Sequence, residues 1–121
     1  MAGVEARDFD SPDETRAPDK TLVHIVRVGG TTVGRIRLEP GWRWSECIKP
    51  VVGTESCRVR HVGLAQSGRL HVEHEDGSDQ EIRPGHVYVI EPGHEAWVVG
   101  DQPVVGYEFD SKAAEEYAKG S

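Results

Sequence analysis

The sequence predicts an all-β fold, a sandwich or barrel of short strands. The chain carries 14 glycines, and turns that contain Gly or Pro interrupt its second half about every 8 to 9 residues. The segments between these turns alternate in polarity and are rich in β-branched residues. No apolar pattern of helix length lies between the predicted strands, so a parallel α/β fold is disfavoured. The 121 residues are enough for one domain with one core.

Residues 1–20 are expected to form a disordered or draping N-terminal arm. The stretch is acidic, contains two prolines and shows little apolar periodicity. Val4 and Phe9 are its only sizeable apolar anchors. A first strand within this stretch is the alternative.

Residues 21–110 are expected to form the barrel. "TLVHIVRV" (Thr21–Val28) alternates and ends at the turn Gly29-Gly30. "TTVGRIRLEP" (31–40) alternates again, and "WRWSECIKPVV" (42–52) is interpreted as a further strand. The later strands are separated by the turns Ser67-Gly68, Asp76-Gly77, Pro84-Gly85, Pro92-Gly93 and Gly100-Asp101.

Residues 111–121 are the only segment with a helical signature. Ser111 would cap a short C-terminal helix and Gly120 would end it.

The charge and the apolar pattern exclude two classes of partner. A formal net charge of −7 argues against binding to nucleic acid, which needs a basic face. No apolar run approaches the roughly 18 residues of a membrane span, and no signal peptide opens the chain. We therefore expect a cytoplasmic protein. Cys47 and Cys57 are too few for a disulfide framework and are expected to be free thiols, one of them a candidate metal ligand.

Three stretches carry a recurring framework of glycines and prolines: "EPGWRWSECIKP", "HVGLAQSGRLHV" and "DGSDQEIRPGHVYVIEPGHEAW". Together they resemble the cupin family of small β-barrels, in particular short stand-alone bacterial cupins. The likeness covers roughly residues 21–110 and depends on the glycines and prolines occurring together in order. It implies a cupin-type double-stranded β-helix, or jelly-roll barrel, that handles a small-molecule ligand and forms a homodimer.

The metal motif of the family is altered in this sequence. By the resemblance, His61 stands where the first cupin motif has its Glu, Cys57 at the second His and Glu55 at the first. The usual His of the second motif falls at Ala96, which cannot bind a metal, and a histidine, His94, lies two residues earlier. Cys57, His61 and His94 are therefore the candidate metal ligands.

The spacing of Cys57 and His61 constrains this hypothesis. On one straight strand the two residues would lie about 13 Å apart, so they share a metal only if the chain turns within Arg58–Arg60. One sulfur and two imidazoles suit Zn²⁺ best, with Fe²⁺ or Ni²⁺ as alternatives, and leave an open coordination position. Glu55 or Glu95 would then act as acid or base.

Each ligand also has an ordinary structural interpretation, in which the protein holds no metal. Cys57 would be a small buried side chain, His61 a hydrogen-bonded imidazole and His94 a turn residue. The resulting alternative is a metal-free ligand-binding or sensor protein without catalysis. A structural dimer is a further alternative. Covalent catalysis by Cys57 is disfavoured because no third orienting group is apparent beside His61.

Aromatic residues are the candidates for the wall of a pocket. They are Trp42, Trp44, Tyr88 and Trp97. Aromatic side chains with a few polar groups are typical of small-ligand sites. Barrel core and a dimer interface are the alternatives for the tryptophans.

Overall fold

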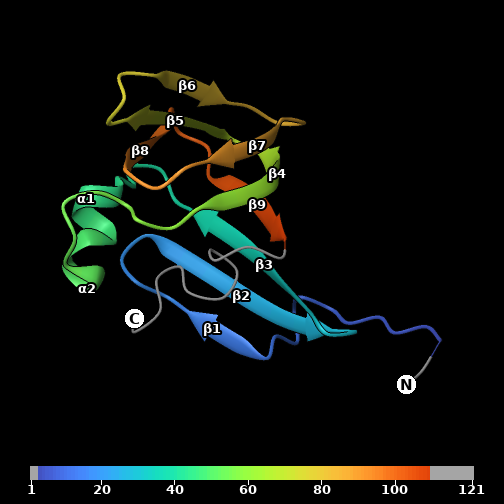
Figure 1. Ribbon diagram of the computed structural model, residues 1–121. Coiled ribbons are helices and arrows are strands. Elements are labelled where there is room, and N and C mark those ends of the chain that lie inside the picture. The colour runs from blue at the N-terminus through green and yellow to red at the C-terminus, as the bar shows by residue number, and fades with distance from the viewer. Residues whose placement is uncertain (1–2, 110–121) are drawn as a thin grey trace.

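The computed structural model describes residues 3–109 as two antiparallel sheets (Figure 1). The strands are β1 (Glu14–Arg16), β2 (Thr21–Val28), β3 (Thr31–Leu38), β4 (His61–Ser67), β5 (Arg69–His74), β6 (Asp79–Ile82), β7 (Val87–Ile90), β8 (His94–Val99) and β9 (Val104–Phe109). The helices are α1 (Trp44–Cys47) and α2 (Lys49–Val52). The prediction of an all-β fold is confirmed. The expected C-terminal helix, residues 111–121, lies outside the described residues.

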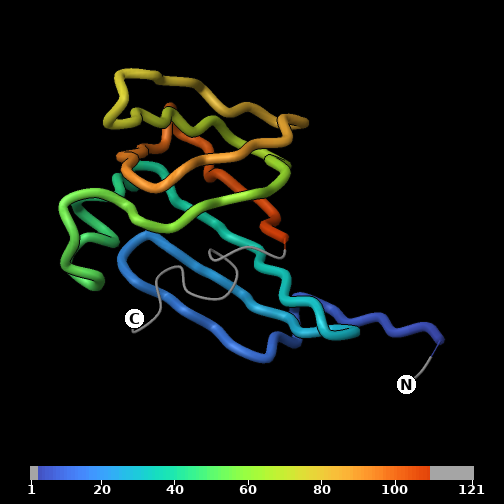
Figure 2. The backbone as a smooth tube through the Cα atoms, in the orientation of Figure 1, coloured from blue at the N-terminus to red at the C-terminus, as the bar shows by residue number. Residues whose placement is uncertain are grey.

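The order of the strands places two strand edges next to an open groove. The larger sheet has the order β1-β2-β3-β9-β4-β7, and the smaller has the order β6-β5-β8. Strands β6 and β7 are each the last strand of their sheet, and residues of both line the groove. Figure 2 shows the chain leaving α2, turning back and running into β4.

The turns that the sequence predicts do separate strands. Gly29 and Gly30 have φ angles of +57° and +77° and join β2 to β3, with Val28 paired to Thr31. Two consecutive positive φ angles match a two-residue hairpin turn, which favours glycine at both positions. The five later turns divide β4 to β9 in the same way.

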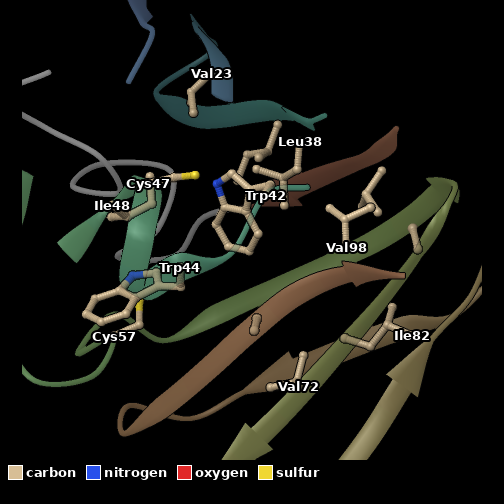
Figure 3. Packing of buried hydrophobic residues seen from close by; sticks show 14 of the residues in the cluster. Val23, Leu38, Trp42, Trp44, Cys47, Ile48, Cys57, Val72, Ile82 and Val98 are labelled. Carbon is tan, nitrogen blue, oxygen red and sulfur yellow. The ribbon is translucent and has the colours of Figure 1, made fainter. Parts of the chain in front are cut away.

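The core lies between the two sheets and extends to α1 (Figure 3). Alternate residues of β2 and β3, such as Val23, Ile25 and Ile36, point inward and are buried. Trp44 and Ile48 are the largest fully buried side chains outside the strands. Burial of each Ile or Val side chain contributes about 1.5–3 kcal/mol.

Residues 42–52, interpreted above as a strand, instead contain the two short helices, so that interpretation is wrong. Trp44, Cys47 and Ile48 are buried, and their i, i+3, i+4 spacing is that of one helix face. Pro50 lies in the first turn of α2, where it is tolerated, and Gly53 ends the helix with a φ of +77°. No helix among residues 3–109 is long and apolar enough to cross a membrane.

The N-terminal segment lies along the larger sheet, and its last part is a strand. The ring of Phe9 contacts that of Tyr107 at a centroid distance of 5.6 Å. The carboxylate of Asp13 accepts a hydrogen bond of 2.7 Å from the backbone N–H of Arg27. Residues Glu14–Arg16 then pair with β2, which corresponds to the alternative of a first strand in this stretch.

Candidate metal centre

Cys57, His61 and His94 converge at one end of the core. One donor atom from each of the three side chains lies within 4.8 Å of the other two, and all three residues are buried. Cys57 Sγ is 3.6 Å from His61 Nε2, and the rings of His61 and His94 are 5.1 Å apart at an angle of 68°. Ligands of one Zn²⁺ ion stand about 4 Å apart, since bonds are roughly 2.0–2.3 Å long. The three side chains therefore lie near the spacing that ligands of a single ion require.

Backbone pairing explains how residues distant in sequence meet. The N–H of Cys57 donates to the carbonyl of His94 at 2.9 Å, and the N–H of Gly93 donates to the carbonyl of Cys57 at 2.7 Å. This bridge fixes Cys57 beside the start of β8, while His61 begins β4. Residues 58–60 bend between the two positions, because a straight strand would separate Cys57 from His61 by about 13 Å.

Each imidazole is oriented by a hydrogen bond at Nδ1. Nδ1 of His61 is 2.8 Å from Glu108 Oε1, and Nδ1 of His94 is 2.8 Å from the carbonyl of Glu91. Carboxylate and carbonyl oxygens only accept, so Nδ1 carries the proton in both rings and Nε2 is left for a metal. Partners of this kind fix the ring and raise the basicity of a metal-binding histidine.

The same contacts shift the acidity of the thiol and the imidazole. Burial raises the pKa of Cys57, but hydrogen bonds and charge from His61 and His94 outweigh it and bring the pKa to about 6. Burial lowers the pKa of His61, while the Glu108 carboxylate and the Cys57 thiolate raise it to about 10. Without a metal, Cys57 and His61 therefore form a thiolate–imidazolium pair at neutral pH.

A small cavity adjoins His61 and His94, two of the three candidate ligands. Its volume is about 50 Å³, and its wall includes His61, His94, Glu108, Trp42, Trp44 and Tyr88. A space of this size holds about three or four water-sized groups. Trp42 Nε1 donates to Thr21 Oγ1 at 3.0 Å. By contrast, Trp44 Nε1 is buried and has no hydrogen-bond partner among the described residues, although buried N–H groups are normally paired.

The structure does not bring Glu95 or Trp97 to this cavity. His94 and Ala96 point inward on β8, so Glu95 and Trp97 point outward by strand alternation. Trp97 lies outside the barrel, with the His71 ring stacked on it at 4.7 Å and the Arg43 guanidinium at 4.4 Å. Glu95 accepts hydrogen bonds from the backbone N–H groups of Ser45 and Ala96.

Glu55 is also remote from the donors. Its side chain is 91% exposed and pairs with Lys49 at 3.2 Å. It lies two residues before the bridge that holds Cys57, on a loop whose backbone carries it to the surface. The acid/base role that the sequence suggested for Glu55 and Glu95 has no geometric support.

Glu108 is the carboxylate at the site, and the sequence analysis missed it. It is buried, and its second oxygen, Oε2, accepts a hydrogen bond of 2.8 Å from the Tyr88 hydroxyl. The sequence carried one signal that Glu108 points inward. Val104, Gly106 and Glu108 occupy alternate positions of β9, so the carboxylate falls on the same face as two buried, uncharged residues.

No family model and no curated relative matches this chain. Among solved structures it resembles the polyketide cyclase RemF from Streptomyces resistomycificus, with a TM-score of 0.61 and 11% identity over 89% of this chain and 79% of that one. A protein of unknown function from Rhizobium leguminosarum gives a TM-score of 0.62 and 20% identity, covering 89% and 96% of the two chains.

Oxalate decarboxylase from Lactobacillus farciminis gives a TM-score of 0.60 and 15% identity, covering 92% of this chain and 34% of that chain. Identities at this level establish the fold alone. The protein has the cupin-type barrel that the sequence resemblance implied.

Proposed function

We propose that the protein binds one divalent transition-metal ion through Cys57 Sγ, His61 Nε2 and His94 Nε2 and presents it to a small molecule. The observation that carries this proposal is the convergence of three buried donors within 4.8 Å. Zn²⁺ suits one thiolate and two imidazoles best, and Fe²⁺ or Ni²⁺ are the alternatives. When bound, the ion supplies a Lewis acid and an open coordination position.

The balance of buried charge supports an ion at this point. The thiolate of Cys57 and the carboxylate of Glu108 are two negative groups, and the imidazolium of His61 offsets only one of them. Buried charge without a partner is costly. A divalent cation that displaces the proton of His61 would bring the sum of these charges to zero.

The chain's own residues would shape what binds at the open position. The Trp44 N–H would donate to an acceptor atom of the bound molecule, since it has no partner among residues 3–109. Glu108, held by His61 and Tyr88, would orient the metal-binding imidazole. The cavity of about 50 Å³ admits only a small group, such as one functional group of a larger ligand.

The test is a titration of chelator-treated protein with Co²⁺, which reports thiolate ligation by an absorption band in the near ultraviolet. We expect one ion per chain, a higher melting temperature and displacement of Co²⁺ by Zn²⁺. The band should disappear in His94→Ala and persist in His74→Ala, whose imidazole binds the carbonyl of Pro92 instead. Absence of both the band and any thermal stabilisation would remove the metal proposal.

A second candidate function follows from one observation, the chain of contacts Cys57–His61–Glu108. Cys57 Sγ lies 3.6 Å from His61 Nε2, and Glu108 lies 2.8 Å from His61 Nδ1. The same arrangement of nucleophile, base and orienting carboxylate activates the cysteine of enzymes that use covalent catalysis. It supplies the third group that the sequence alone did not reveal.

Alkylation distinguishes the two functions. With a cysteine nucleophile, iodoacetamide modifies Cys57 of the chelator-treated protein much faster than Cys47, and Glu108→Gln slows this reaction at least tenfold. With a metal centre alone, Cys57 is still a thiolate once the metal is removed, but its 3% exposure keeps its alkylation as slow as that of Cys47 in the absence of denaturant. Both rates are read by peptide mass spectrometry.

A further inference from the structure

A second, larger space lies between the free edges of the two sheets. This groove has a volume of about 610 Å³, within the range usual for small-molecule sites. Its floor and rims combine apolar and polar side chains, including Val72, His74, Gln80, His86, Val87 and Val89. The metal cavity alone, at about 50 Å³, is too small for a molecule of metabolite size.

The groove and the cavity share a wall. Ile82, Tyr88 and Ile90 line both spaces, and Ile90 is paired directly with His61 across β4 and β7. The groove therefore ends next to the candidate metal ligands.

Tyr88 is the part of this wall that contacts the site chemically. Its hydroxyl donates to Glu108, which binds His61. Two glycines make room for it, because a Cβ atom would lie 2.7 Å from the hydroxyl at Gly63 and 3.0 Å from it at Gly106. The aromatic ring is only half-buried, so its rotation toward the groove would join the two spaces.

We propose that the groove binds the body of the ligand whose donor atom reaches the metal, and that Tyr88 is the gate between groove and metal. This inference rests on the proposed metal centre. The groove fits a neutral or cationic, partly apolar molecule that carries one nitrogen or oxygen donor. Three carboxylates, of Asp76, Asp79 and Glu91, line the groove, and no Lys or Arg among the described residues lines either space. A phosphate or polycarboxylate ligand is disfavoured for that reason.

The experiment uses the full chain loaded with Co²⁺ and two azoles with the same donor atom, imidazole and 4-phenylimidazole. Only the phenyl group needs the groove. We expect 4-phenylimidazole to bind at least ten times more tightly than imidazole, as measured by the change in the cobalt absorption spectrum.

The decisive variant is Gln80→Trp, which fills the groove from β6. This variant should lower the affinity for 4-phenylimidazole at least tenfold and change the affinity for imidazole less than twofold. The matched control is Gln66→Trp, at an exposed position on the other face of the larger sheet, where neither azole should be affected. Tyr88→Phe, which frees the ring from Glu108, should speed the association of 4-phenylimidazole several-fold.

The outcomes separate the two proposals. If Co²⁺ binds but the two azoles bind equally in wild type and in Gln80→Trp, the groove proposal is overturned and the metal centre stands. If Co²⁺ does not bind, the metal centre is wrong and the groove proposal falls with it. Should Gln80→Trp fail to fold, Val87→Trp, at a 77% exposed position on the groove rim, serves in its place.

Discussion

The two cysteines of the chain are equally buried but lie in different chemical surroundings. Cys47 and Cys57 are both free thiols with 3% exposure. Cys47 lies in α1 with its Sγ 3.8 Å from Asp19 Oδ2, and burial is the main cause that raises its pKa. Cys57 faces two imidazoles, which outweigh burial and lower its pKa to about 6. Burial alone therefore does not decide whether a thiol becomes a ligand, and the neighbouring side chains do.

The sharpest way to break this comparison is to remove each sulfur in turn. We expect Cys57→Ser to lower the affinity for Co²⁺ at least 100-fold, because a thiolate ligand is lost. Cys47→Ser should leave that affinity within twofold of wild type. Competition with a chelator of known affinity measures both, and equal effects of the two substitutions would contradict the assignment.

The pH dependence of metal binding should come from the region around Cys57. The pKa of His61 is raised to about 10, so its proton must leave before Nε2 can bind a metal. Cys57, with a pKa of about 6, has no proton to lose above that pH. Between these values one proton is released per ion, and the apparent affinity should rise about tenfold per pH unit. A flat profile from about pH 7 to 9 would show that His61 is not a ligand.

Two glutamates allow a similar comparison between a residue that contacts a candidate ligand and one that does not. Glu108→Gln should lower metal affinity about 10- to 100-fold, because the carboxylate orients His61 and makes it more basic. Glu95→Gln, on the outer face of β8, should have no effect on that affinity. Both are measured by Co²⁺ titration, with the melting temperature as the check on folding. Similar losses in the two variants would point to a general effect of charge instead.

The smallest expected effect compares two tryptophans that line the same cavity. Trp44→Phe should weaken the binding of formate to Co²⁺-loaded protein about fivefold, the loss of one hydrogen bond worth about 1 kcal/mol. Trp42→Phe should leave formate binding unchanged, since its N–H is already bonded to Thr21. It should instead lower the free energy of unfolding, measured by urea titration. Unchanged formate binding in Trp44→Phe would mean that this N–H does not face the ligand.

The glycine and proline turns made the strand framework predictable, because each turn has its own local chemistry. The candidate ligand set could also be named from the sequence. His94 is two residues from Ala96, and a shift of two residues keeps a side chain on the same face of a strand. The same alternation places Glu95 and Trp97 outside, a consequence that the sequence analysis did not draw.

Two other features were not predicted. One depends on contacts between distant segments, and the other on apolar residues with the spacing of a helix and not of a strand. Glu108 reaches His61 because Gly63 on β4 is paired with Glu108 on β9, and no local motif encodes that register. The helical segment carried a local signal in the spacing of Trp44, Cys47 and Ile48, but the surrounding β pattern favoured a strand there.

The candidate ligands do not belong to a single sheet. His61 is part of the six-stranded sheet and His94 of the three-stranded one, and no strand pairing joins the two sheets within residues 3–109. An ion held by both histidines would link the six-stranded sheet to the three-stranded sheet. Loss of the ion would therefore remove a link between the two sheets at this end of the barrel, and not only a reactive group.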